Sequence, residues 1–155
     1  MPTFSQTPKA LLRLIHYPPQ LAYVIGLGPL LGKLVLLLTT TGRKSGKPRV
    51  TPLQYEEIGG DYYVGAARGY QSDWVRNIQN DPIVKIRVKN EQFQGYAKII
   101  TEPSRIAMFL AYRYQRHPRM MASMLHGEGL SIPPERNELE NFAKNLVLVI
   151  VHPQE

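Results

Sequence analysis

Residues 83–89 alternate strictly between apolar and cationic side chains, with Val84, Ile86 and Val88 on one face. A period of two residues is typical of a strand that turns one face to a core and the other to solvent. Five further short apolar segments bounded by Gly, Pro, Asn or Asp are also predicted as strands: residues 35–41, 49–57, 62–67, 92–101 and 146–151. The pattern predicts a mainly β (α+β) chain whose six antiparallel strands close into a small barrel, since closure removes sheet edges.

Helical spacing of apolar residues appears between these strands. Residues 72–80 can be capped by Ser72 or Asp73, and residues 104–116 follow Pro103. Two shorter helices are expected at residues 120–125 and 134–144. At the N-terminus, residues 8–17 form an amphipathic pattern that two prolines end, so the barrel is predicted to carry an N-terminal helix as well as inserted ones.

The chain has 155 residues, of which 43% are hydrophobic, and this is the size of one ordinary domain. We expect a single domain over residues 1–155, with the N-terminal helix within 1–20 and the barrel within 33–151. Cysteine is absent, which excludes disulfides and thiolate metal sites and fits a reducing cytosol.

No secretory signal is recognised, and residues 21–38 contain three glycines and a central Lys33 that favour an irregular loop over a membrane span. A cytoplasmic protein is expected. Peripheral membrane contact through the N-terminus and a homodimer both remain open alternatives.

The positive charge is concentrated in the first third of the chain. The formal net charge is +7, residues 1–55 hold seven cations and no acid, and Glu56 is the first acidic residue. Four of the seven cations fall within residues 43–49. A focused cluster suggests a site for a discrete anion, whereas an evenly basic chain would suggest a general polyanion binder.

Residues 39–49, TTTGRKSGKPR, carry that cluster. A Walker phosphate loop needs four residues between its glycines and a following helix, but three residues separate Gly42 from Gly46, and Pro48 follows Lys47. The segment is instead predicted as a strand–loop–strand unit whose glycines allow left-handed backbone. The residues expected to converge on phosphate or carboxylate oxygens are Thr41, Gly42, Arg43, Lys44, Ser45, Lys47 and Arg49. A solvated hairpin tip is the alternative; the absence of an acid nearby in the sequence argues against it.

The sequence gives little support for a metal site, a hydrolytic active site or a nucleic-acid-binding surface. The four histidines are scattered and no metal-ligand spacing or Gly-x-Ser-x-Gly elbow occurs, so no metal site and no hydrolytic nucleophile are expected. Aromatic residues are not interleaved with the cationic cluster and no helix-turn-helix pattern is present, so no nucleic-acid partner is expected.

Three motifs together resemble a known family. LLLTTTGRKSGKPRVTPL, then VGAARG, then SDWVRNIQNDP followed by the alternating strand are similar to the deazaflavin-dependent nitroreductases, over about residues 36–101. These proteins are split β-barrels related to the oxidoreductases that bind flavin mononucleotide (FMN). The resemblance implies the same FMN-binding-like split barrel for this chain.

The resemblance also implies a cofactor, coenzyme F420, a deazaflavin with a phosphate and a polyglutamate tail. It places Arg43, Lys44 and Arg49 on the phosphate and glutamyl carboxylates. The ring would be lined by the backbone of Val50, Thr51 and Pro52 and bordered by Ala66, Ala67 and Arg68, while Trp74 would pack in the barrel.

The implied reaction is hydride transfer from reduced F420 to a small electrophilic acceptor such as a quinone, an enone or a nitro compound. Tyr55 is our candidate proton donor. Gln54 and Ala67 stand where a known family member has tyrosine and serine, so cofactor binding transfers better than substrate choice. An FMN-dependent oxidoreductase of the same fold and a non-catalytic cofactor-binding protein are the alternatives.

Overall fold

The computed structural model describes residues 35–154. The N-terminal helix expected at residues 8–17, most of the loop expected at 21–38, and any membrane contact made there lie outside the described residues.

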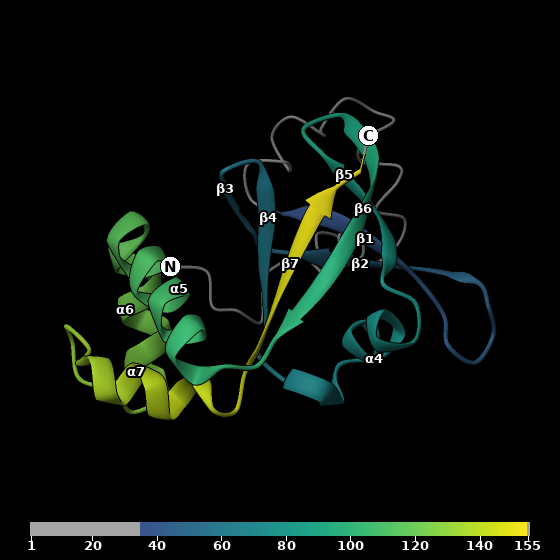
Figure 1. The fold of residues 1–155 in the computed structure, drawn as a ribbon. Coiled ribbons are helices and arrows are strands. Elements are labelled where there is room, and N and C mark those ends of the chain that lie inside the picture. The colour runs from purple at the N-terminus through teal and green to yellow at the C-terminus, as the bar shows by residue number, and fades with distance from the viewer. Residues whose placement is uncertain (1–34, 155) are drawn as a thin grey trace, which may run out of the picture.

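Seven strands form one antiparallel sheet in the order β2-β1-β5-β6-β7-β4-β3. Figure 1 shows the sheet curled into a half-barrel. The strands are β1 (Leu36–Thr41), β2 (Pro48–Leu53), β3 (Glu56–Ile58), β4 (Asp61–Ala66), β5 (Ile83–Val88), β6 (Glu91–Ile100) and β7 (Val147–Pro153).

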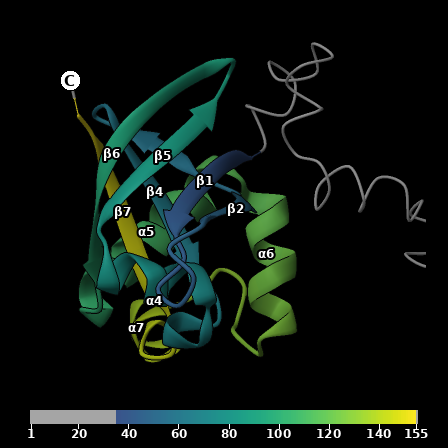
Figure 2. The same cartoon turned by 90° about the vertical axis from the view of Figure 1, so that its right-hand side faces the viewer.

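The helices lie in two places. The short α4 (Asp73–Asn80), preceded by the 3-10 turn η2 (Gly69–Gln71), lies below β1 and β6 in Figure 1 and below β1 in the turned view of Figure 2. The other three, α5 (Pro103–Arg116), α6 (Pro118–Gly127) and α7 (Arg136–Ala143), gather beside β4 and β7. No helix within residues 35–154 is long and apolar enough to cross a bilayer.

Alternation along β7 produces two cores. Val147, Val149 and Val151 join the core inside the curled sheet, together with Trp74 of α4. Leu148 and Ile150, on the opposite face of the strand, belong to a second core shared with α5, α6 and α7. A strand buried on both faces has no polar face, which explains why residues 146–151 read as an unbroken apolar run.

The prediction of six strands in a closed barrel is wrong in two respects. The segment predicted as one strand, residues 49–57, is broken at Gln54 and Tyr55 into β2 and β3, which occupy opposite edges of the sheet. One continuous strand cannot lie at both edges, so the chain crosses the open side there. In the described part of the chain β2 and β3 do not pair with each other, so the sheet is a half-barrel and keeps both edges.

Candidate functional site

The loop between β1 and β2 is shaped by its two glycines. The N–H of Gly42 donates to the carbonyl oxygen of Lys47 at 2.8 Å, and the N–H of Gly46 donates to that of Gly42 at 2.8 Å. Gly46 has a φ of +69°, which an L side chain rarely adopts. A Cβ at Gly42 would lie 2.7 Å from the Ser45 Oγ and 3.2 Å from the Lys47 carbonyl oxygen. Gly46 therefore has the left-handed backbone that the sequence predicted, whereas Gly42 is favoured by the close approach of its neighbours.

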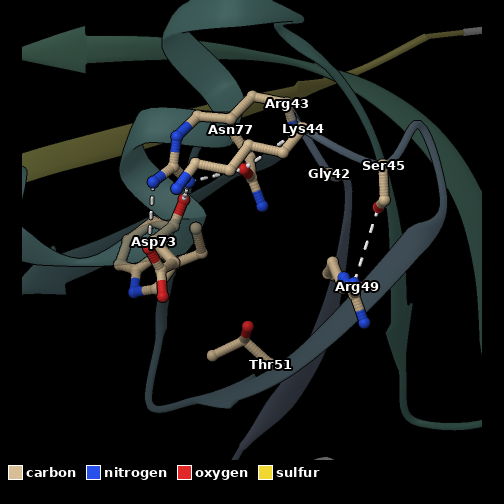
Figure 3. A pocket seen from close by; sticks show the side chains of 9 residues that line it. Gly42, Arg43, Lys44, Ser45, Arg49, Thr51, Asp73 and Asn77 are labelled. Carbon is tan, nitrogen blue, oxygen red and sulfur yellow. Dashed lines mark hydrogen bonds and ion pairs between the residues drawn. The ribbon is translucent and has the colours of Figure 1, made fainter.

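A pocket of about 440 Å³ lies between this loop and α4 (Figure 3). The β1–β2 hairpin contributes most of the residues that line the pocket, and α4 contributes the others. The lining residues are Gly42, Arg43, Lys44, Ser45, Arg49 and Thr51, with Asp73, Trp74 and Asn77 from α4. Six of the predicted cofactor-binding residues thus meet in one cavity.

Arg43 is held by α4. Its Nη2 lies 3.1 Å from the Asp73 Oδ1, and its Nη1 donates to the Asn77 Oδ1 at 3.0 Å and to the Asp73 carbonyl oxygen at 3.5 Å. The expectation that no acid compensates the cluster is therefore wrong for Arg43. Asp73 lies thirty residues further along the chain and reaches Arg43 only because α4 docks beneath the loop.

Asn77 is fixed from its other side. Its side chain is 3% exposed, and its Nδ2 donates to the Oγ1 of Thr40, which is 1% exposed, at 3.1 Å. Its Oδ1 also accepts from the backbone N–H of Arg43 at 3.2 Å. One amide therefore connects β1, the loop and α4.

The remaining cations of the cluster have no such partner. Lys44, Lys47 and Arg49 are exposed, and within residues 35–154 none of them makes an ion pair. The Nη2 of Arg49 lies 3.5 Å from the Ser45 Oγ, at the limit of a hydrogen bond. Lys44 and Arg49 line the pocket, whereas Lys47 is not among its lining residues. Two unpaired cations at the wall of a cavity can bind an anionic group.

The other predicted residues lie elsewhere. Thr41 and Val50 line two separate clefts that share Lys85. Ala66 and Ala67 line an apolar cavity of about 110 Å³ between β4 and the three clustered helices. Pro52 and Arg68 are not among the residues that line the pocket beside α4. The structure therefore gathers the predicted anion-binding residues but does not bring the predicted ring-binding residues into the same cavity.

Tyr55 also lies apart from that pocket. It lines a cavity of about 420 Å³ with Arg116, His117 and neighbouring residues. The Tyr55 ring lies 5.8 Å from that of Tyr62, centroid to centroid. Burial, and then the nearby carboxylates of Glu57 and Glu91, raise the pKa of the Tyr62 hydroxyl.

A second charged cluster, which the sequence did not predict, surrounds Glu56. This carboxylate is 3% exposed, and its oxygens lie 2.9 Å from the Arg116 Nε, 3.0 Å from the His117 Nε2 and 3.5 Å from the Arg113 Nε. The two arginines and the histidine come from the end of α5 and the residue that follows it, about sixty positions along the chain. We call this group the Glu56 cluster. In the described part of the chain, no group of three or more His, Asp or Glu residues is placed to hold a metal ion.

Three comparisons relate the chain to known proteins. Residues 23–123, more than half of the chain, match the profile of the family described as F420H(2)-dependent quinone reductase. An F420H(2)-dependent quinone reductase of Mycobacterium tuberculosis is 38% identical over 66 residues, which are 41% of this chain and 44% of that protein. The chain thus spans less than half the length of this curated relative.

Solved structures show the same fold at low sequence identity. A structure described as an F420-H2 dependent reductase superposes with a TM-score of 0.51 at 21% identity, covering 76% of this chain and 93% of the other. HutZ, a heme storage protein from Vibrio cholerae, superposes with a TM-score of 0.55 at 15% identity, covering 89% and 90%. Since proteins with different ligands share this fold, the fold alone does not decide the ligand.

Proposed function

The chain belongs to the F420H(2)-dependent quinone reductase family, and we propose that it is a reductase that uses reduced coenzyme F420, whose anionic tail lies against the loop between β1 and β2. The observation that carries this proposal is the pocket beside α4, where Lys44 and Arg49 face the cavity without a carboxylate partner among the described residues. A cavity lined by unpaired cations attracts an anion.

The residues present fit the anionic end of F420. The cofactor carries a phosphate and several glutamyl carboxylates, and the loop offers Lys44, Lys47 and Arg49 along one exposed hairpin. FMN carries a single phosphate, which needs fewer of these cations. The number of unpaired cations therefore favours the longer anion.

The ring end of the cofactor rests on the family resemblance. Thr51 lines the pocket and lies on β2, an edge strand that pairs only with β1 among the described strands. An edge strand presents backbone N–H and C=O groups without a ladder partner, which are the groups a flat heterocycle can bind. We propose that this edge binds the ring through the backbone of Val50, Thr51 and Pro52, and that Ala66, Ala67 and Arg68 border it.

Bound F420 in its reduced form supplies a hydride to an electrophilic acceptor such as a quinone, an enone or a nitro compound. In this proposal the chain's own contribution is to hold the cofactor by its charges and to orient it. Tyr55 is proposed to donate the proton that completes the reduction, from its position at the crossover between β2 and β3. In Tyr55→Phe, kcat should fall while the Kd for F420 stays unchanged.

The test compares three ligands by titration: F420, the same deazaflavin without its phosphate and glutamyl tail, and FMN. We expect wild-type protein to bind F420 most tightly, and Lys44→Gln or Arg49→Gln to raise its Kd about 10-fold, since a charge-assisted contact contributes about 1.5 kcal/mol. Neither variant should change the affinity for the tailless deazaflavin. Lys98→Gln, which removes an exposed charge from β6 outside the pocket, is the matched control.

Activity is then measured with reduced F420 and a panel of quinone, enone and nitro acceptors. Reduction of at least one acceptor is expected. Tighter binding of FMN than of F420 would select the FMN-dependent alternative, and F420 binding without reduction of any acceptor would select the non-catalytic one.

A further inference from the structure

Arg43 differs from the other cations of the loop, because both terminal nitrogens of its side chain already have partners. Both terminal nitrogens of its guanidinium contact Asp73 or Asn77, at 3.0–3.5 Å. Its backbone N–H is bound by the same Asn77 oxygen. A guanidinium that already gives three of its five N–H donors to the protein has fewer left for a ligand than a guanidinium without partners.

The two partners of Arg43 are not equivalent. The Asp73 side chain is 82% exposed, and ion pairs in solvent contribute little. Asn77 is 3% exposed and has both ends of its amide bound, one by Thr40 and one by Arg43. A buried side chain that is hydrogen-bonded at both ends of its amide is held in one orientation, so Asn77 rather than Asp73 determines where Arg43 lies.

The loop that Asn77 holds is the one that carries the unpaired cations. Lys44 follows Arg43 directly, and Arg49 lies on β2 opposite Thr40, the residue that fixes the Asn77 amide. Gly42 and Lys47 close the loop by a backbone hydrogen bond of 2.8 Å. Fixing Arg43 therefore fixes the place from which Lys44 and Arg49 reach the pocket (Figure 3).

We propose that Asn77 is the positioning residue of the anion-binding loop and that Arg43 acts as part of this support rather than as a direct ligand-binding residue. This inference rests on the proposed function, and it reassigns one of its residues: the anionic tail is bound by Lys44, Lys47 and Arg49. It predicts that Arg43 and Asn77 act as one unit in ligand binding.

A double-mutant cycle tests this unit. In Asn77→Ala and in Arg43→Ala the Kd for F420 should each rise about 10-fold, and the double variant should lie within 3-fold of the weaker single variant. If Arg43 binds the ligand independently of Asn77, the two effects multiply to about 100-fold and the proposal fails. Asp73→Asn should change the Kd by less than 3-fold; a larger rise would move the positioning role to Asp73 and also overturn the proposal.

A matched variant of the same helix distinguishes a positioning role of Asn77 from a general effect on the stability of α4. Val75→Ala removes buried volume from α4, where Val75 is 0% exposed and is not among the residues that line the pocket. It should lower Tm but leave the Kd for F420 within 2-fold of wild type. If Val75→Ala weakens binding as much as Asn77→Ala does, general loosening of α4 explains the result and the positioning role is rejected.

A measurement on the free protein separates failure of this inference from failure of the proposed function. Amide hydrogen exchange at Arg43 and Gly46 should accelerate at least 10-fold in Asn77→Ala and not in Val75→Ala, whether or not F420 is the ligand. Unchanged exchange overturns the inference, whereas wild-type protein that binds no F420 overturns the proposed function only. Should Asn77→Ala not fold, Thr40→Val removes the acceptor that fixes the amide and should accelerate the same exchange by a smaller factor.

Discussion

The two charged clusters of this protein are built in opposite ways. In the Glu56 cluster, two arginines and a histidine surround one carboxylate that is 3% exposed. Within residues 35–154, the four cations of the loop between β1 and β2 have one acid as an ion-pair partner, Asp73, and it pairs with Arg43 alone. Both clusters collect cations, yet only the loop keeps some of them unpaired among the described residues.

The difference separates a structural cluster from a binding cluster. The Glu56 carboxylate connects the start of β3 to α5 and to the residue before α6, so its charges are used in holding layers together. Lys44, Lys47 and Arg49 hold no element to another by an ion pair within residues 35–154. Charge that contributes nothing to the fold is available to a ligand.

The largest expected effect comes from breaking the structural cluster. Glu56→Gln leaves Arg113, whose side chain is 15% exposed, beside a neutral group. Removing one partner of a buried ion pair costs about 3–5 kcal/mol, so we expect the free energy of unfolding to fall by about that amount in urea titrations. Glu57→Gln, which loses only an exposed pair with Lys89, is the control and should cost less than about 0.5 kcal/mol. A loss below about 1 kcal/mol in Glu56→Gln would contradict the structural reading.

A smaller loss of stability is expected when the loop backbone is disturbed. Gly42→Ala places a Cβ 3.2 Å from the Lys47 carbonyl oxygen, which belongs to the backbone and cannot rotate away. We expect a cost of about 1–3 kcal/mol in unfolding experiments, together with at least a 10-fold rise in the Kd for F420, because the cations move with the loop. Gly127→Ala, where nothing lies within 4 Å, should change neither quantity appreciably. Unaltered F420 affinity in Gly42→Ala would show that loop geometry does not control binding.

The smallest effect on stability is expected from the unpaired cations. Lys44→Gln and Lys47→Gln should change the free energy of unfolding by no more than about 0.5 kcal/mol, because no folded-state ion pair of the described chain is lost. The same substitutions should weaken F420 binding, and raising the salt concentration should weaken wild-type binding more than that of the variants, because exposed charges are screened. A large loss of stability in either variant would show that the loop cations, like those around Glu56, are structural.

Local sequence signals predicted most of the secondary structure. The helices expected at residues 72–80 and 104–116 correspond to α4 and α5, and the alternating segment 83–89 corresponds to β5. In the turn that follows β5, Lys89 and Asn90 have positive φ. Capping, proline and alternation act within a few residues of one another, which is why they can be read directly from the chain.

The break between β2 and β3 could not be predicted from local sequence signals. Residues 49–57 are β-prone throughout, and nothing local marks Gln54 and Tyr55 as the point where the chain leaves one sheet edge for the other. That crossover depends on how the whole sheet curls. The sequence prediction of one strand was therefore locally reasonable and globally wrong.

What the sequence determined by itself is the composition and the backbone of the anion-binding loop. Gly42, Gly46 and the run of cations lie within eight residues, and their conformation follows from local sterics and local hydrogen bonds. Only the tertiary structure decided which of those cations is already bound to another part of the protein. Asp73 and Asn77 are thirty and thirty-four residues away from Arg43, and they reach it because α4 packs its Trp74 and Val75 into the core beneath the loop. Ion pairing depends on distance in space, and packing sets that distance.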